Sequence, residues 1–348
     1  HYYNLKVKEV IRETDEAISI AFEQPEGKLD YQSGQFLTLI TDIDGKSVRR
    51  AYSLSSSPYT DEELVVTIKR VKDGLMSNYL NDHVKAGDTI EVMEPMGHFT
   101  TDYARSNKRH IIMFGGGSGS TPLLSIAKSV LSQEPDSIVS LIYANRDIDS
   151  IIFRDQFQKL ETTYEGRLHV IHILDHAPLE WQGHSGLLNH DMLVKLLERI
   201  PDWGLENTTY LMCGPEGMMN NVETLLAEQN IPEDRIYKES FVAGTINKSD
   251  ESTAGEIATQ DVTILYEGEE HVVSVSPDTT ILDAALDLDI DLPYSCQSGL
   301  CTACRGKCLS GEVTMDEDEG LSDAEKNAGY VLPCVSHPLT NDVKIEIG

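Results

Sequence analysis

The feature that most constrains the fold of this chain is the spacing of four cysteines near its C-terminal end. Cys296, Cys301 and Cys304 follow the pattern C-x4-C-x2-C, and a further 29 residues separate Cys304 from Cys334. One tight loop can thus offer three thiolates to a metal centre while a distant segment supplies the fourth, as in plant-type [2Fe–2S] clusters. A structural zinc site is the alternative, which this spacing disfavours. The pattern predicts a one-electron carrier with a potential near about −400 mV.

The residues around these cysteines support a cluster loop. The loop contains the small or permissive residues that a backbone wrapped around a cluster requires, namely Ser298, Gly299, Thr302, Ala303 and Gly306. Cys308 is a possible competing ligand, but Pro333-Cys334 fits the last position better, and Cys308 is then a small buried hydrophobic residue. Six cysteines in 348 residues are too few for a disulfide scaffold. Together with the metal-type spacing they favour a reducing compartment, so we expect a cytoplasmic protein.

Length and charge limit what else the chain contains. At 348 residues it is much longer than the unit of about 90 residues that the cysteine loop implies, so two or three domains are expected. About half of the net charge of −30 lies in residues 259–348, with 18 acidic and 4 basic residues. Such a surface repels nucleic acid and steers toward basic protein partners, although an acidic proteome in a salty habitat explains it equally well.

The hydrophobic pattern divides the chain. No apolar run approaches 18 residues, so no membrane span is expected. The sequence starts at His1 rather than Met, which leaves open whether residues preceded it. Short alternating runs up to residue 105, such as 37–40 and 64–68, predict an antiparallel β-barrel. From 106 to 241, buried strands at 111–114, 138–143, 168–174 and 209–213 alternate with helical runs, which predicts an α/β doubly wound parallel sheet. Residues 242–259 are typical of a polar linker, and 260–348 contain a hairpin, a helix and the cysteine loop.

A first cofactor motif, Arg50-Ala51-Tyr52-Ser53, stands at the end of a barrel-type strand. Arg50 can pair with a pyrophosphate, Tyr52 can stack on a flat ring, and the Ser53 hydroxyl can reach a ring nitrogen. Gly74-Leu75-Met76-Ser77 follows and opens a helical run from Ser77 to His83. A glycine turn with a serine at a helix N-terminus is a place to hold phosphate, and a plain N-cap at Ser77 is the alternative.

Two further turns follow buried strands of the α/β region. Gly115-Gly116-Gly117-Ser118-Gly119-Ser120-Thr121-Pro122 lies between a strand and a helix, where glycines let a backbone approach a pyrophosphate. It differs from G-x-G-x-x-G, so a Rossmann dehydrogenase is not indicated. Cys213-Gly214-Pro215-Glu216 also ends a strand before a helix. In an open parallel sheet both turns lie on the edge where ligands bind.

In this order and spacing, R-x-Y-S, G-x-x-S, G-G-G-x-G-x-T-P and C-G-P resemble the ferredoxin–NADP⁺ reductase superfamily, with a fused plant-type ferredoxin. More narrowly, 49–53, Gly97-His98-Phe99, Tyr143-Ala144-Asn145-Arg146 and Glu239-Ser240-Phe241 look like the reductase subunits of phenylacetyl-CoA epoxidase and 3-ketosteroid 9α-hydroxylase. The resemblance implies an FAD-binding β-barrel at 1–105, an NAD(P)-binding α/β domain at 106–241, a linker at 242–259, and an α+β β-grasp ferredoxin domain at 260–348.

The resemblance also implies roles for single residues. Arg50 would hold the FAD pyrophosphate, Tyr52 would pack on the isoalloxazine and Ser53 would lie near N5. The rest of the FAD site would be Gly74, Met76, Ser77, Thr121 and Phe241, the last as a gate or stacking partner. Cys213 would lie where nicotinamide meets flavin, and the nicotinamide cofactor's phosphates would contact Gly115, Gly116, Gly117, Ser118, Gly119, Thr121, Gly214 and Pro215. Ser120 is a departure, since the family usually carries an apolar residue there, and we expect it to alter packing more than chemistry.

The choice between NADH and NADPH depends on a second group of charges. Arg146, with Arg154 as a second donor, can pair with a 2′-phosphate, whereas Asp147 and Asp149 beside it disfavour that charge. The balance favours NADPH.

These motifs together predict an enzyme, an NAD(P)H:acceptor oxidoreductase that passes electrons from NAD(P)H through FAD and a [2Fe–2S] cluster to a partner protein. The resemblance favours an oxygenase as the partner. A reductase for a hybrid-cluster or haem protein would share every motif, and a redox-sensing iron–sulfur binding module is the alternative from another class. The acidic run 316–319 is either a docking site for the partner or a solvated loop. Without an H-E-x-x-H pattern, a serine nucleophile elbow or a Walker loop, hydrolase and NTPase activities are excluded.

Overall fold

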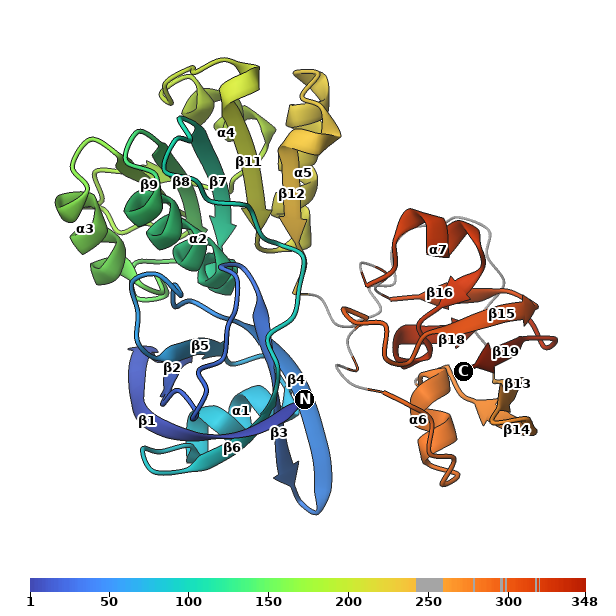
Figure 1. Cartoon of the computed structure of the whole chain (residues 1–348). Helices are drawn as coiled ribbons and strands as arrows, with labels where there is room; N and C mark the ends of the chain where they lie inside the picture. The colour runs from blue at the N-terminus through green and yellow to red at the C-terminus, as the bar shows by residue number, and fades with distance from the viewer. Residues whose placement is uncertain (242–258, 278, 295–296, 298, 317, 319) are drawn as a thin grey trace. The chain divides into compact units, whose positions relative to one another are not determined.

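The computed structural model describes residues 1–241, 259–277, 279–294, 297, 299–316, 318 and 320–348. The chain divides into two compact units, His1–Phe241 and Val242–Gly348 (Figure 1). The predicted linker lies almost wholly outside the described residues. Within the part of the chain that is described, no helix is both long and apolar enough to cross a membrane.

The first unit begins with a six-stranded antiparallel sheet in the order β4-β3-β6-β1-β2-β5. A bridge between Leu54 and Val66 joins the end of β4 to β5, so the sheet curls into the predicted barrel. One face of each strand supplies a core that includes Leu37, Leu39 and Ile68. The strands are β1 (Tyr2–Thr14), β2 (Ala17–Phe22), β3 (Phe36–Ile43), β4 (Lys46–Ser53), β5 (Leu64–Lys69) and β6 (Thr89–Met93), and helix α1 (Leu75–His83) lies between the last two.

The start of α1 differs from the predicted one. The helix begins at Leu75 with Gly74 as its N-cap, two residues before Ser77. The Ser77 hydroxyl is therefore inside the first turn, where it accepts a hydrogen bond from the backbone N–H of Val71 at 3.0 Å. The N-cap interpretation of Ser77 was wrong, because the extended Gly74 takes that position.

The rest of the first unit is a parallel sheet with helices on both faces (Figure 1). Its strand order is β10-β9-β8-β7-β11-β12, with the reversal beside β7, as expected for a doubly wound fold. Buried residues of α2 and α3 share one core with one face of the sheet, and those of α4 and α5 share another with the opposite face. The strands are β7 (His110–Gly116), β8 (Ile138–Asn145), β9 (Leu168–Leu174), β10 (His184–Ser185), β11 (Thr208–Cys213) and β12 (Ile236–Glu239), and the helices are α2 (Ser120–Gln133), α3 (Arg154–Thr163), α4 (His190–Leu197) and α5 (Glu216–Glu228).

Helix α2 joins the parallel sheet to the barrel through polar contacts. Ser125 Oγ donates to the carbonyl of Ser56 at 2.6 Å, and Lys128 Nζ lies 3.1 Å from Asp61 Oδ2. The hydroxyls of Ser129 and Ser57 lie 2.7 Å apart in a buried position. Because these groups are buried or half-buried and directional, they fix one orientation of α2 against the barrel.

The second unit has a mixed five-stranded sheet in the order β14-β13-β19-β15-β17, and a separate pair, β16 with β18. Its core includes Ile264, Leu282 and Ile345. The strands are β13 (Gln260–Tyr266), β14 (Glu269–Val275), β15 (Gly306–Ser310), β16 (Val313–Met315), β17 (Tyr330–Val331), β18 (Ser336–Pro338) and β19 (Lys344–Ile347), and the helices are α6 (Ile281–Leu286) and α7 (Asp323–Asn327). The predicted hairpin and helix are thus present, and the sheet with a helix packed on it is an α+β fold.

Candidate functional site

The end of β4 presents the residues of the predicted flavin motif on two faces. Tyr52 pairs with Leu37 on the core side, whereas Ser53 pairs with Phe36 on the other side of the strand. Burial raises the pKa of the Tyr52 phenol to about 12, so it is a neutral ring at pH 7. Ser53 is 4% exposed, and its Oγ has no hydrogen-bond partner in the described residues. A buried hydroxyl of this kind costs free energy unless a ligand atom completes it, so the site fits a polar ring edge such as that of FAD.

The turn before α1 supplies the second part of this site. Gly74 and Met76 lie at the start of the helix, and Met76 is buried in the barrel core. Ser77 Oγ accepts from Val71, which leaves its own proton for an acceptor such as a phosphate oxygen. Arg50 is exposed at the end of β4 and is therefore accessible to an anionic ligand.

The glycine loop crosses from β7 to α2 in a single tight turn. Gly117–Gly119 form a turn of 3-10 helix, and Gly117 has a φ of +53°, in the left-handed region. A Cβ on Gly119 would lie 2.0 Å from the carbonyl oxygen of Cys213, so only glycine permits this approach. Thr121 Oγ1 donates to the carbonyl of Ser118 at 2.9 Å. The loop thus brings backbone N–H groups to the start of α2, an arrangement that suits a pyrophosphate.

The loop after β11 lies against the glycine loop. Gly214 and Pro215 follow Cys213, and a Cβ on Gly116 would lie 2.6 Å from the Pro215 ring. The Cys213 side chain is wholly buried in the core that α2 shares with the sheet. Phe241, at the end of the first unit, is 41% exposed. Both glycine-containing turns are therefore together at the carboxyl edge of the sheet, as predicted.

The charged residues predicted to read a 2′-phosphate follow β8. Arg146 is exposed, and its Nε lies 3.1 Å from Asp147 Oδ2. Asp147 also accepts hydrogen bonds from the N–H and hydroxyl of Ser150 at 2.9 and 2.7 Å, and these contacts lower the pKa of its carboxyl. Arg154 is the first residue of α3 and is exposed. Asp147 thus already holds one of the two cations.

Two residues near the glycine loop were not anticipated as site residues. Lys69, the last residue of β5, places its Nζ 3.2 Å from the position that a Cβ on Gly117 would take. Tyr143 is fully buried in β8, and its hydroxyl lies 3.1 Å from the carbonyl of Gly117 and 2.9 Å from Ser120 Oγ. Neither residue adjoins the loop in sequence, so only the pairing of the strands could have revealed them.

The cluster loop is described in part, since Cys296 lies outside the described residues. Cys304 and Cys334 are 2% and 6% exposed, and Cys301 is half-buried. The N–H of Gly320, which follows the acidic run, donates to the carbonyl of Gly299 at 2.9 Å, so Gly320 lies beside the loop. Cys308 is half-buried in β15 rather than buried as predicted, and its Sγ donates to the carbonyl of Ser310 at 3.3 Å. Among the described residues, no three cysteine, histidine or acidic side chains gather closely enough to hold a metal ion, so the cluster assignment depends on the spacing of the four cysteines.

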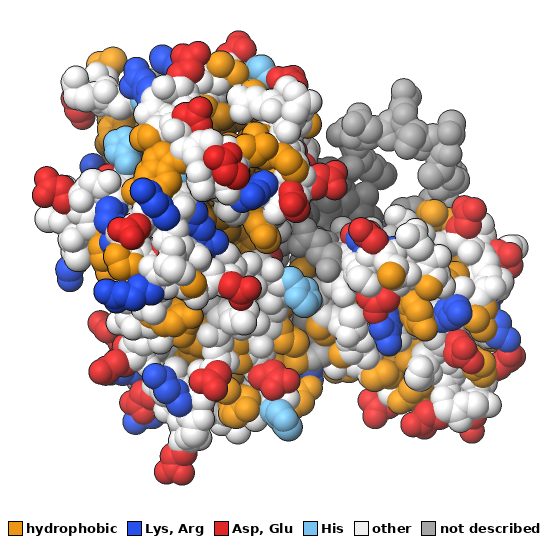
Figure 2. Space-filling model, turned by 45° about the horizontal axis from the view of Figure 1, so that its top comes forward, with side chains coloured by type: hydrophobic (Ala, Val, Ile, Leu, Met, Phe, Trp, Pro, Cys, Tyr) orange, Lys and Arg blue, Asp and Glu red, His pale blue; other side chains and the backbone are white. Residues whose placement is uncertain are grey.

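The acidic run is only partly described. Asp318 forms an ion pair with Lys326 at 2.9 Å, and Glu317 and Glu319 lie outside the described residues. Acidic side chains are spread over the visible face of both units rather than gathered in one patch (Figure 2). The docking role of the run stays a prediction.

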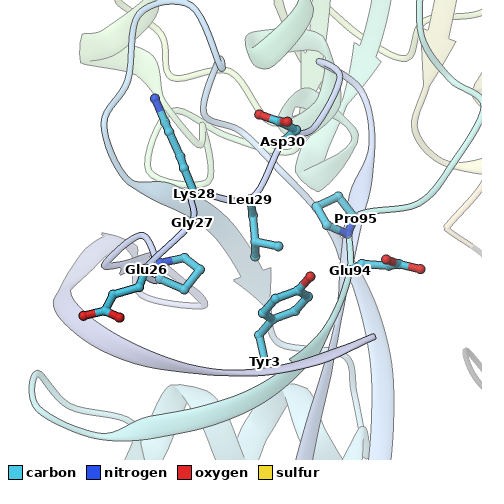
Figure 3. A pocket seen from close by; sticks show the side chains of 9 residues that line it. Tyr3, Glu26, Gly27, Lys28, Leu29, Asp30, Glu94 and Pro95 are labelled. Carbon is cyan, nitrogen blue, oxygen red and sulfur yellow. The ribbon is translucent and has the colours of Figure 1, made fainter.

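A pocket of about 270 Å³ lies elsewhere, on the barrel between β1, the segment after β2 and the end of β6. Tyr3 and Leu29 point toward each other in it, and Glu94 points outward (Figure 3). None of its lining residues belongs to the predicted cofactor motifs. The pocket is therefore not the flavin or nucleotide site.

Family models match three successive parts of the chain. The oxidoreductase FAD-binding domain matches residues 3–101, the oxidoreductase NAD-binding domain matches 113–224, and the 2Fe-2S iron-sulfur cluster binding domain matches 264–339. These findings confirm the predicted fold classes, their order and the three cofactors.

Curated relatives match over nearly the whole length. The ferredoxin reductase component of 3-ketosteroid-9-alpha-monooxygenase from Rhodococcus rhodochrous is 38% identical over 98% of this chain and 96% of its own. One of the subunits of 1,2-phenylacetyl-CoA epoxidase from Escherichia coli is 34% identical over 99% of this chain and 97% of its own. Both are relatives that the sequence motifs predicted.

Among solved structures, phthalate dioxygenase reductase has a similar fold, with a TM-score of 0.68 over 99% of this chain and 98% of that one, at 22% identity. The curated relatives and the two oxidoreductase family models confirm the prediction of an oxidoreductase. The chain belongs to the family of oxygenase reductase components that carry an FAD-binding, an NAD-binding and a [2Fe–2S] domain in one polypeptide.

Proposed function

We propose that this chain takes electrons from NAD(P)H and delivers them, one at a time, to a partner oxygenase of the kind that the relatives serve, a monooxygenase or an epoxidase. The order of the three domain matches along one chain carries the proposal. Bound FAD would supply the conversion of a two-electron donor into single electrons, which an iron–sulfur cluster requires. We assign the domains to 1–105, 106–241 and 260–348, joined by 242–259, and the protein to the cytoplasm.

The residues of β4 and α1 would hold the flavin. Arg50 would pair with the pyrophosphate, Tyr52 would pack on the ring system, and the Ser53 hydroxyl would bond to the ring edge near N5. The buried, unpartnered Ser53 Oγ supports this assignment. The remaining contacts would come from Gly74, Met76, Ser77, Thr121 and Phe241.

The carboxyl edge of the parallel sheet would hold the nicotinamide nucleotide. Its phosphates would meet the amides of 115–119 and the nearby Lys69 ammonium, and Gly214 and Pro215 would form the opposite wall. The contact between Gly119 and the Cys213 carbonyl supports this placement. Cys213, being buried, would shape the floor where the nicotinamide meets the flavin. Arg146 and Arg154 would receive a 2′-phosphate, in competition with Asp147.

Cys296, Cys301, Cys304 and Cys334 would hold the cluster. The chain offers a matched control for this assignment, because Cys308 is a nearby cysteine outside the ligand set. In the cofactor-loaded chain, Cys304→Ser should abolish reduction of cytochrome c by NAD(P)H and remove the cluster's visible absorption. Reduction of ferricyanide, which accepts electrons from flavin, should persist.

Cys308→Ser should keep both activities and the cluster spectrum. Loss of the cluster in Cys308→Ser, or cytochrome c reduction that survives in Cys304→Ser, would contradict the ligand assignment. A wild-type chain that binds FAD and the cluster but fails to oxidise NADH or NADPH would contradict the reductase function itself. A redox sensor predicts that last result.

A further inference from the structure

The hydroxyls of Tyr143 and Ser120 form a buried polar group directly beneath the glycine loop. Tyr143 is fully buried in β8 and Ser120 opens α2, also fully buried. Their oxygens lie 2.9 Å apart. Ser120 Oγ lies 3.0 Å and Tyr143 Oη 3.1 Å from the carbonyl oxygen of Gly117, so both hydroxyls converge on this one acceptor.

The Gly117 carbonyl also accepts the backbone N–H of Ser120, and the two hydroxyls reinforce the direction that this bond gives it. Tyr143 Oη also lies 3.0 Å from the carbonyl of Ile152, which anchors it from the side opposite the loop. Each of the two hydroxyls has one proton to donate. The possible acceptors are the carbonyl oxygens of Gly117 and Ile152 and the oxygen of the other hydroxyl. Because its donors, the Ser120 and Tyr143 side chains, are fully buried, the oxygen of the half-buried Gly117 is held toward the protein interior.

The direction of this carbonyl determines the direction of the next amide. A trans peptide is planar, with its C=O and N–H pointing in opposite directions, and no cis peptide occurs in the described residues. When the Gly117 carbonyl points inward, the Ser118 N–H must point outward, to the side on which Gly117 and Ser118 are partly exposed. The bond from Thr121 Oγ1 to the Ser118 carbonyl aims the Gly119 N–H in the same way.

We propose that Tyr143 is a positioning residue for the nicotinamide nucleotide: through Ser120 it holds the Gly117 carbonyl inward and thereby aims the Ser118 amide at a phosphate oxygen. Tyr143 touches no substrate in this role. The Ser120 hydroxyl is paired with the Tyr143 hydroxyl, so in this role it acts on binding chemistry as well as on packing. The inference rests on the proposed function, because it assumes that the loop binds the nucleotide's phosphates.

The test compares Tyr143→Phe and Ser120→Ala with the wild-type chain, all loaded with FAD and the cluster. ADP-ribose carries the pyrophosphate without the nicotinamide, and adenosine carries neither phosphate. Each single variant should weaken ADP-ribose binding about 5-fold to 30-fold, as loss of one hydrogen bond from a buried hydroxyl implies. Adenosine binding and the flavin spectrum should stay unchanged. The KM for the reduced nucleotide should rise while kcat at saturation stays within about twofold, since the chemical step is untouched.

The control is Tyr210→Phe, the same deletion on β11, where Tyr210 packs in the core on the opposite face of the sheet. It should leave the affinity for ADP-ribose unchanged. The double variant Tyr143→Phe/Ser120→Ala should lose no more affinity than the worse single variant, because both hydroxyls act on one carbonyl.

Unchanged ADP-ribose affinity in both single variants would overturn the proposal, and so would equal losses for ADP-ribose and adenosine or fully additive losses in the double variant. A wild-type chain that binds no ADP-ribose and oxidises neither nucleotide would instead overturn the proposed function. If Tyr143→Phe fails to fold, Ser120→Ala decides the matter alone, since it removes a single oxygen.

Discussion

Glu134 lies immediately after the last residue of α2, and its carboxylate is wholly buried. It accepts hydrogen bonds from Arg109 Nε and Nη2, both at 2.9 Å, from Asn107 Nδ2 at 2.8 Å and from Ser137 Oγ at 2.9 Å. Its backbone carbonyl accepts from Arg167 as well. The C-terminal end of α2 is thus tied to the segment before β7 and to the segment before β9.

Replacement of Glu134 by Gln should strongly destabilise the first unit. The shape is kept, but the charge is lost and one acceptor becomes a donor that faces Arg109 or Asn107. Disrupting a buried ion pair at one partner costs ~3–5 kcal/mol. A second estimate counts the loss of two hydrogen bonds to a charged group, at ~1.5–3 kcal/mol each. It gives ~3–6 kcal/mol, which agrees with the cost of breaking the ion pair. At ~2–4 °C per kcal/mol for a unit of this size, the melting temperature should fall by ~6–20 °C.

The measurement is urea denaturation of the cofactor-loaded chain, followed by flavin fluorescence for the first unit and extrapolated linearly to water. Glu23→Gln is the matched control, because Glu23 pairs with Lys6 across 3.9 Å on the surface. Its cost should stay below ~1 kcal/mol. A loss under ~1 kcal/mol for Glu134→Gln, or equal losses in the two variants, would refute the argument from burial.

Three further predictions follow from single contacts. Asp147→Asn should raise the ratio of kcat/KM for NADPH to that for NADH several-fold, because the substitution removes the negative charge that pairs with Arg146. If kinetics with both nucleotides show an unchanged ratio, the assignment of Arg146 to the 2′-phosphate is wrong. Gly119→Ala should weaken ADP-ribose binding severely, since its Cβ would overlap the Cys213 carbonyl, whereas Gly217→Ala, with open space around it, should keep full affinity in the same titration. Burial lowers the pKa of His110 and His172, so both are neutral at pH 7 in the folded chain. Their contribution to the free energy of unfolding should be complete above pH ~6.5 and decline on acidification. His172→Gln should flatten that decline in denaturation curves measured from pH 7 to 5.

Much of the fold is predictable from local pattern. Continuous apolar runs such as 111–114 and 138–143 become β7 and β8 because strands covered on both faces need apolar residues throughout. The alternation in the first part of the chain likewise marks a sheet with one buried face. The order of turn motifs then gives the position of both glycine-containing turns, since the carboxyl ends of parallel strands share one edge.

The polar contacts that refine the site are not predictable in this way. Tyr143 and Ser120 are distant in sequence, and Ser120 read in isolation only suggests altered packing. Their partnership depends on the register that sets β8 beside β7, with Tyr143 opposite Gly115. The start of α1 was misplaced for a similar reason, because the contact between Ser77 and the Val71 N–H is local in space but invisible to a rule that places serine at the N-cap.

Helix α2 is consequently fixed at three points, each by buried or half-buried polar contacts. Its N-terminal end is held by the Tyr143 and Ser120 hydroxyls, its middle by Ser125 and its neighbours against the barrel, and its C-terminal end by the Glu134 carboxylate. A purely apolar interface would tolerate small rotations of the helix, whereas directional hydrogen bonds with desolvated partners do not. The same helix carries the glycine loop and contacts the barrel that bears Ser53. If the glycine loop binds the nucleotide as proposed, a substitution at Glu134 too mild to unfold the unit should therefore raise the KM for NAD(P)H, although Glu134 lies at the opposite end of α2 from that loop.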